Sequence, residues 1–466
     1  MLFSSLSFLY VFLPLVLVIY YLVPKKLKNV ILLLFSLVFY FVGEQELVLL
    51  MLLSALLDFF CSLSIERFRG KRAIMRLFLL VSLLGNLSLL GYFKYADLII
   101  QSINAILDTQ LHLLKIALPI GISFFTFQTM SYTFDVYRGD VKAERNFLDF
   151  FTYVTLFPQL IAGPIVRYQT VAVELKERRF DLEGFGYGVR RFCIGLGKKI
   201  LIANTMAGAC QIYGKMPEKT VLFTWVYAIA FTLQIYFDFS GYSDMAIGLG
   251  KMFGFSFPEN FNYPYLAKSA AEFWRRWHMT LGGWFRDYVY IPLGGNRVPV
   301  LRYILNIMIV WFLTGLWHGA EYNFILWGLY YGILLILEKY LLKKPLQKGK
   351  VLPHLYLIFI TLIGFILFDS SSITEAIQTC GRLFGAGAAF TNVTSTYYAR
   401  SYAFIIVIAS ILATPLPKQI FQVAKNLKTG GVALKVLEPA VCLLILAVST
   451  AYLVDGSYNP FMYFRF

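Results

Sequence analysis

Apolar runs of about twenty residues recur along the whole chain and constrain its fold more than any other feature. A helix needs about 20 mainly apolar residues to cross a bilayer, so each run predicts one membrane helix. The stronger runs are 7–23, 28–43, 47–65, 74–93, 116–136, 221–237, 303–318, 322–340, 354–369, 402–417 and 437–454, and the weaker runs are 147–166 and 192–213.

Charged residues are too scarce for a soluble protein of this length. They make up 15% of the 466 residues, and hydrophobic residues make up 59%, whereas a soluble domain carries about 25% charged residues. Such a chain could not cover itself with a wetted surface. The sequence therefore predicts an all-α polytopic membrane protein with about 11–13 membrane helices, including re-entrant segments, built as a single domain over residues 1–466.

Basic residues gather between the apolar runs, which is the pattern of cytoplasmic loops in membrane proteins. The main basic loops are 25–28, 67–76, 339–350 and 418–435, and they account for the formal charge of +16 without a nucleic-acid partner. Counting from these loops, the C-terminal helix and tail at 437–466 lead to the outside. No positive charge precedes the first run, so we expect a retained helix rather than a cleaved signal peptide. We expect a multi-pass protein of the cell (inner) membrane.

Two segments near the middle of the chain do not fit simple spanning helices. Residues 147–166 lie between two basic stretches and contain Pro158, Gly163 and Pro164, which would leave backbone groups unpaired in lipid. Residues 256–297 are too polar to span and too apolar for an open loop. We expect both segments to be re-entrant and packed around a cavity.

Several polar clusters in this apolar chain need an explanation, because ionisable groups inside a membrane are costly. The stretch 238–244 contains Asp238, Ser240, Tyr242 and Asp244. It predicts either a hydrogen-bond cluster between helices or the polar wall of a substrate path. Three arginines, Arg275, Arg276 and Arg286, alternate with aromatic residues, which favours either an interfacial belt or a phosphate site.

His318 is the sharpest candidate for a catalytic residue. It ends a long apolar run and has Gly315 and Gly319 beside it, and we expect these glycines to bring backbone close and to leave room for a ligand. Imidazole has an unperturbed pKa near 6.5, which suits a general base in acyl transfer. Five scattered cysteines include no C-x-x-C pair, so we expect no metal site. The chain also lacks G-x-S-x-G, Walker and H-E-x-x-H motifs.

Six short sequence motifs together resemble those of the membrane-bound O-acyltransferase (MBOAT) family, in particular its alginate O-acetyltransferase branch. They cover 120–330 most densely, and their residues are 157–165 (FPQLIAGPI), 238–244 (DFSGYSD), 257–265 (FPENFNYPY), 272–278 (EFWRRWH), 284–297 and 313–320 (LTGLWHGA). The resemblance implies a helical membrane fold around a central tunnel. His318 matches the family's catalytic histidine and His278 its second position, while Trp317 joins the stretch at 238–244 along the tunnel.

The resemblance also implies substrates and a partner. The expected donor is acetyl-coenzyme A on the cytoplasmic side, a substrate rather than a permanently bound cofactor. Arg275, Arg276 and Arg286 are then candidates for holding its phosphates. An extracytoplasmic partner of the SGNH or esterase-like class would place the acetyl group on a polysaccharide, which includes alginate, other exopolysaccharides and peptidoglycan as candidates. Membrane lipid surrounds the protein.

The aromatic tail predicts an acyl relay at Tyr463. The loop charges place this tail outside, and a phenol oxygen can accept an acyl group and pass it on. The ending also resembles the short aromatic motif on a small membrane companion of the related D-alanylation systems. A simple aromatic anchor is the other interpretation of the tail.

Two other functions stay open at this point. One is transfer of D-alanyl or another acyl group by the same fold, which the volume of the acyl pocket would decide. The other is a polysaccharide transporter that performs no chemistry, which would need neither paired histidines nor a donor site.

Overall fold

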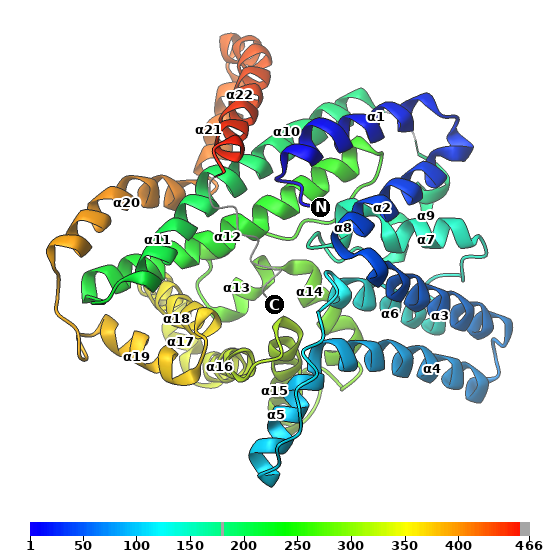
Figure 1. The fold of residues 1–466 in the computed structure, drawn as a ribbon, viewed down its shortest axis with the longest axis horizontal. Helices are drawn as coiled ribbons and strands as arrows, with labels where there is room; N and C mark the ends of the chain where they lie inside the picture. Colours follow the sequence, from blue (N-terminus) through cyan, green and yellow to red (C-terminus); the bar gives the residue numbers. More distant parts are fainter. Residues whose placement is uncertain (179–180, 457–466) are drawn as a thin grey trace. The chain divides into compact units, whose positions relative to one another are not determined.

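The computed structural model describes residues 1–178 and 181–456, and over these residues its regular structure is helical, with no strand (Figure 1). This confirms the all-α prediction. Eight helical segments in the described part are long and apolar enough to cross a membrane. The sequence predicted more because 28–43 and 47–65 form one continuous helical segment, the first helix is short, and the run at 116–136 is interrupted.

The chain divides into two compact units, each described by itself. Unit 1 comprises Met1–Phe192 and Met245–Pro258, and unit 2 comprises Cys193–Asp244 and Glu259–Phe466. The single-domain organisation stays a prediction.

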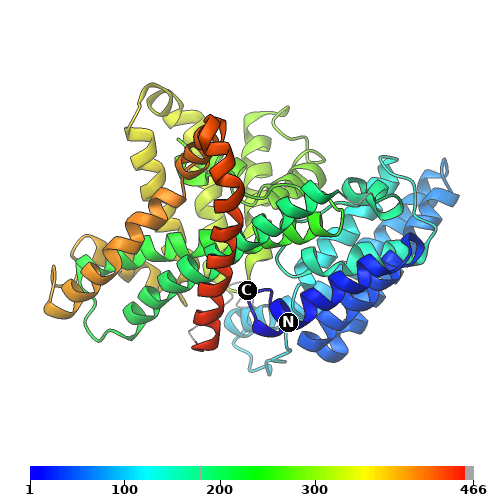
Figure 2. The same cartoon turned by 90° about the horizontal axis from the view of Figure 1, so that it is seen from above.

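Unit 1 is built largely of helices that run alongside one another, drawn in blue to cyan in Figures 1 and 2. Its elements are η1 (Phe8–Phe12), α1 (Leu13–Leu22), η2 (Lys25–Leu27), α2 (Lys28–Glu44), η3 (Gln45–Leu47), α3 (Val48–Arg67), α4 (Arg72–Leu90), η4 (Gly91–Tyr95), α5 (Ala96–Leu107), α6 (Ile122–Arg138), α7 (Phe147–Thr155), α8 (Phe157–Leu160), α9 (Tyr168–Lys176) and most of α10 (Leu182–Gly197).

Prolines and glycines set where the helices of unit 1 begin and break. The run expected at 116–136 becomes helical only at Ile122, because Gly121 has a left-handed backbone with φ of 78°. The run at 147–166 breaks into α7 and the single turn α8, which carries Pro158. The side chain of Gln159 then donates to the carbonyl of Tyr153 at 2.6 Å. As predicted, this segment is buried in protein and forms no spanning helix.

Unit 2 carries the remaining elements. They are η5 (Lys198–Ala203), α11 (Asn204–Lys215), α12 (Val221–Met252), η6 (Pro264–Leu266), α13 (Ala270–Arg276), α14 (Met279–Phe285), η7 (Arg286–Tyr290), α15 (Val300–His318), α16 (Tyr322–Leu337), η8 (Glu338–Leu342), α17 (Lys343–Lys348), α18 (Leu352–Asp369), α19 (Ile373–Leu383), α20 (Val393–Leu412), α21 (Leu416–Asn426) and α22 (Lys428–Val454). The last part of α12, from Met245, belongs to unit 1.

Two regions of unit 2 bear directly on the sequence predictions. The helix expected at 221–237 continues through the polar stretch 238–244, because no proline interrupts it, and α12 reaches 32 residues. Residues 256–297 form only short helices joined by turns, so this segment does not span, as predicted.

Helices α15 and α16 pack with their backbones almost in contact. A Cβ atom built on Gly328 would lie 2.2 Å from the carbonyl oxygen of Trp311 and 3.1 Å from the Cα of Gly315. Such an approach is open only to glycine, as in other close helix pairs in membranes. The contact fixes α15, and with it the residue at its end, His318.

Gly328→Ala should therefore lower stability. The added methyl group has no space, so α15 and α16 must separate, which we expect to cost about 1–3 kcal/mol. The measurement is the apparent Tm of the purified protein in detergent. Gly186→Ala on α10 is the matched control, because nothing lies within 4 Å of the new Cβ atom. Equal shifts in the two variants would contradict the close-packing interpretation.

Candidate active site

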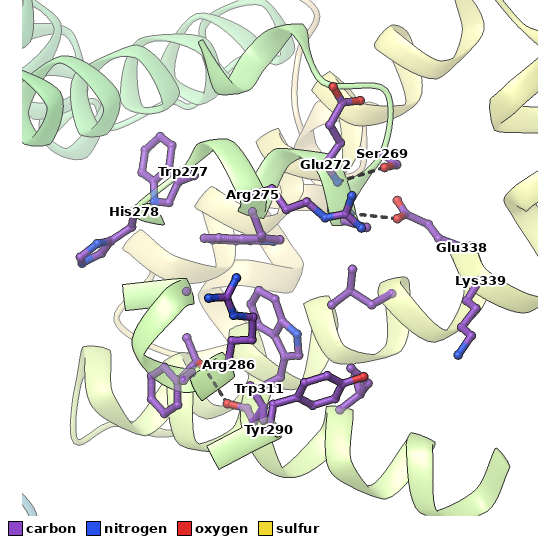
Figure 3. A pocket seen from close by; sticks show the side chains of 18 of the residues that line it. Ser269, Glu272, Arg275, Trp277, His278, Arg286, Tyr290, Trp311, Glu338 and Lys339 are labelled. Atoms are coloured by element: carbon purple, nitrogen blue, oxygen red, sulfur yellow. Dashed lines mark hydrogen bonds between the residues drawn. The ribbon is translucent and has the colours of Figure 1, made fainter. Parts of the chain in front are cut away.

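Unit 2 contains a cavity of about 1060 Å³ that brings together residues from 268–347 (Figure 3). Helices α13 and α14, together with η7, supply one part of its wall, and α15, η8 and α17 supply another. Both predicted histidines, His278 and His318, border it. The sequence therefore identified two residues that lie 40 positions apart and share one cavity.

His318 is the last residue of α15 and is 7% exposed. Its ring lies edge-on to aromatic rings, with centroids 4.9 Å from Trp327 and 5.4 Å from Phe368. The glycines beside it allow the close approach expected of them. A Cβ atom on Gly315 would lie 2.4 Å from the carbonyl oxygen of Phe324, and one on Gly319 would lie 2.2 Å from the Phe324 ring. They therefore let α16 pack closely against the end of α15, and the room for a ligand stays a prediction.

His278 lies at the junction of α13 and α14 and is 2% exposed. Its backbone is left-handed, with φ of 44° and ψ of 52°, a conformation that costs roughly 1–2 kcal/mol outside glycine. The Phe239 ring packs against the imidazole at 4.6 Å between centroids. Burial, and after it the nearby His318, lower the pKa of His278 well below its usual value. His278 is therefore a neutral imidazole at physiological pH.

The short helix α13 is held at its N-terminus by two carboxylates and one hydroxyl. Ser269 caps the helix by accepting from the N–H of Glu272 at 3.1 Å, and Glu272 accepts from the N–H of Lys268 at 2.9 Å. Glu338, the first residue of η8, accepts from the N–H groups of Ala270 at 2.5 Å and Ala271 at 3.0 Å. The helix that leads to His278 is thus fastened to η8 (Figure 3).

Cationic side chains line the part of the cavity away from His278. Arg275 and Arg286 border it, and in Figure 3 they lie between His278 on one side and Lys339 on the other. Arg276 is not among the lining residues, because it pairs with Glu272 at 2.8 Å. Sequence reasoning missed the lining lysines, which are Lys268, Lys339 and Lys343. Lys339 and Lys343 fall in a predicted cytoplasmic loop, which was the available signal.

The polar stretch of α12 forms ion pairs instead of bordering this cavity. Asp238 pairs with Lys199 of η5 at 2.5 Å, and both side chains are 2% exposed. Asp244 pairs with Lys198 at 2.6 Å. The residues described as lining the cavity do not include these aspartates, nor do they include the buried Ser240, Tyr242 and Trp317. Their assignment to a tunnel stays a prediction, and Tyr463 lies outside the described residues.

Trp317 nevertheless connects the two histidines by ring contacts. Its ring centroid lies 5.1 Å from that of His318 and 5.7 Å from that of His278. Among the described residues, no cluster of three or more His, Cys, Asp or Glu side chains could hold a metal ion. The site thus offers two buried imidazoles for proton transfer and a group of cations for an anionic substrate.

The fold and the site together are those of an all-helical membrane protein with two buried histidines at a cavity that cationic side chains border. The membrane-bound O-acyltransferase family model matches residues 142–344, and the chain is 36% identical to a probable alginate O-acetylase (AlgI) of Pseudomonas putida over the whole of both chains. The chain belongs to the membrane-bound O-acyltransferase family. It is a multi-pass membrane enzyme, an O-acyltransferase.

Two further relatives show the range of the family around this chain. A peptidoglycan O-acetyltransferase of Helicobacter pylori is 36% identical over 73% of this chain and 70% of its own length. A teichoic acid D-alanyltransferase of Bacillus subtilis is 29% identical over 50% of this chain and 62% of its own length. The similarity to O-acetylases is thus both higher and more extensive.

Proposed function

We propose that this enzyme takes acetyl groups from cytoplasmic acetyl-coenzyme A and moves them across the inner membrane for O-acetylation of an extracytoplasmic polysaccharide. Two relatives that match 100% and 73% of this chain are named as O-acetylases of alginate and peptidoglycan. A transporter without chemistry does not fit membership of an enzyme family. D-alanyl transfer is the second candidate, supported by the partial similarity to the Bacillus subtilis protein.

The observation that carries the donor proposal is the charge of the cavity. Arg275, Arg286 and the three lining lysines face a space large enough for a nucleotide-bearing thioester. Guanidinium groups bind phosphate oxygens in a planar, bidentate manner, and lysines add point charge. Two of these lysines belong to a loop that the positive-inside rule places in the cytoplasm, where acetyl-coenzyme A is made available.

The proposed chemistry uses His318 as a general base. The acceptor hydroxyl oxygen forms a bond to the thioester carbonyl carbon while its proton passes to the imidazole of His318. The carbon–sulfur bond then breaks, and the thiolate leaves with the electron pair. The imidazolium returns the proton to the sulfur, so that an ester and a thiol are the net products. The low pKa of neutral His278 leaves the second imidazole available as a hydrogen-bond or proton acceptor.

The last steps need groups beyond the cavity. In this proposal the acceptor hydroxyl is the phenol of Tyr463, which enters the outer mouth of the tunnel and is acetylated with help from His318. An extracytoplasmic partner of the SGNH or esterase-like class then transfers the acetyl group from the phenol oxygen to the sugar, and the phenol is regenerated. Each transfer exchanges one ester for another, so no additional co-reactant is needed.

A donor assay on the purified protein tests this function. Release of thiol from acetyl-coenzyme A, compared with release from a D-alanyl thioester, decides between the two candidate acyl groups. Arg275→Ala should raise the KM for acetyl-coenzyme A about tenfold or more with kcat little changed, because a charge-assisted hydrogen bond is worth about 1.5–3 kcal/mol.

The adjacent Arg276→Ala is the matched control, since Arg276 pairs with Glu272 and is not among the residues that line the cavity. Its KM should stay within about twofold of wild type. Equal rises in both variants would indicate a general loss of structure, and no rise in either would remove the cation-lined region as the donor site.

A further inference from the structure

Asn260 is a buried polar residue that faces His278 from a loop 18 positions earlier in the chain. Its side chain is 0% exposed. The amide oxygen, Oδ1, lies 3.1 Å from Nδ1 of His278 and 2.9 Å from the hydroxyl of Thr280. The backbone N–H of Thr280 donates to the same oxygen at 3.3 Å. A single amide oxygen thus meets three donor groups.

These contacts determine which nitrogen of His278 carries hydrogen. The N–H of Thr280 can only donate, so the amide atom beside it is the oxygen and not the NH₂ group. An amide oxygen can only accept, so Nδ1 of His278 must be the protonated nitrogen. In a neutral imidazole the other nitrogen, Nε2, then carries the lone pair and can only accept. Nε2 is buried and has no hydrogen-bond partner among the described residues.

Asn260 also holds the strained turn in which His278 lies. Its carbonyl oxygen accepts from the N–H of Met279 at 3.0 Å, immediately after the left-handed residue. Together with the bonds from Thr280, this attaches the loop to the first turn of α14. Strained backbone of this kind persists only where the surroundings fix it, and it concentrates at functional sites.

We infer that Asn260 is the positioning residue that keeps His278, which borders the cavity, in its Nδ1–H form, with Nε2 as a hydrogen-bond or proton acceptor. The inference rests on the proposed role of His278 in acyl transfer. In this form Nε2 of His278 accepts a hydrogen bond from an N–H or O–H group of the substrate. Nε2 cannot donate a hydrogen bond to the thioester carbonyl. An uncharged amide suits the task, because a carboxylate in its place would favour the imidazolium.

The other charged or titratable groups near His278 do not take over this role. They are His318 on α15, Arg275 and Arg286 in the cavity wall, and the Asp238–Lys199 pair beside Phe239. His318 disfavours a proton on His278. The described contacts therefore assign the Nδ1 hydrogen bond to Asn260.

The pH dependence of kcat with acetyl-coenzyme A tests the inference on the full-length enzyme. Asn260→Asp keeps the acceptor and adds charge, so the rising limb of the profile should move to higher pH by about one unit or more, with activity recovered there. Asn260→Ala should lower kcat about tenfold or more at every pH and leave KM within about twofold. A wild-type profile in Asn260→Asp, or a wild-type kcat in Asn260→Ala, would overturn it.

Asn262 supplies the matched controls, because it lies in the same loop but is exposed. Asn262→Ala and Asn262→Asp should both keep the wild-type profile. If the Asn260→Ala protein fails to accumulate, the pH profile of Asn260→Asp still tests the inference, because aspartate has nearly the same shape as asparagine.

A spectroscopic measurement separates this inference from the proposed function. The chain has four histidines, so ¹⁵N-histidine labelling with the other three changed to Gln isolates His278 for solid-state NMR. We expect a protonated Nδ1 and an unprotonated Nε2. The reverse pattern would overturn the inference even if acetyl transfer is confirmed, and the expected pattern would sustain it even if the acyl donor proves different.

Discussion

His318→Ala should lower acetyl transfer by about 10²–10⁴-fold while the protein still accumulates in the membrane. The side chain ends α15 in a ring of aromatic residues and borders the cavity, where we expect it to take the proton of the attacking hydroxyl group. Removing the base leaves the hydroxyl weakly nucleophilic. The measurements are thiol release by the purified protein and the acetyl content of the exported polymer, each normalised to protein level.

His112→Ala is the control for this experiment, because His112 is exposed in unit 1. It should retain the wild-type rate. A His318→Gln variant keeps the approximate side-chain size without a basic nitrogen and should be as inactive as His318→Ala. If either His318 variant keeps more than about a tenth of the activity, the assignment of His318 as the general base is wrong.

His278→Ala should lower the rate by about 10²-fold or more, the second largest expected effect. The buried neutral imidazole borders the same cavity and contacts Trp317, which also contacts His318. If the two histidines act in one step, the His278→Ala/His318→Ala double variant should be no slower than His318→Ala alone, because residues that act as a unit are not additive.

The rates of the two single variants and the double variant are measured as thiol release at a saturating concentration of acetyl-coenzyme A. If the fold losses in rate of the two single variants multiply in the double variant, the histidines do not share a step and act in separate steps. Because His278 also occupies a strained turn, the Tm of each variant must be recorded, and a His278→Asn variant, which tolerates left-handed backbone, separates loss of the imidazole from loss of the turn.

Hydropathy predicted most of the fold because a membrane leaves few choices for an apolar run. The break in 147–166 was predictable for the same reason, since Pro158, Gly163 and Pro164 together would leave backbone groups unpaired in lipid. The extent of α12 was not, because its polar residues at 238–244 resemble a segment outside the membrane. Lys199 and Lys198 neutralise the two aspartates, and these pairings join residues about 40 positions apart, which no local pattern reveals.

Candidate site residues that lie in a sequence motif were predictable. Residues whose role depends on a contact with a distant part of the chain were not. His318 and His278 were found through their motifs, and both border the cavity. Arg275 and Arg276 could not be separated by composition, although the i, i+4 spacing of Glu272 and Arg276 was a usable signal. Asn260 was missed, because its role depends on a loop folding back onto the start of α14.

The Glu338 carboxylate links α13 to the part of the cavity wall that carries Lys339. This carboxylate holds the first turn of α13, and the next residue in the chain is Lys339 of the cavity wall. Two hydrogen bonds to the Glu338 carboxylate therefore join the residue beside Lys339 to the first turn of α13. An anion bound by Lys339 would therefore lie one residue along the chain from the carboxylate that holds the helix leading to His278.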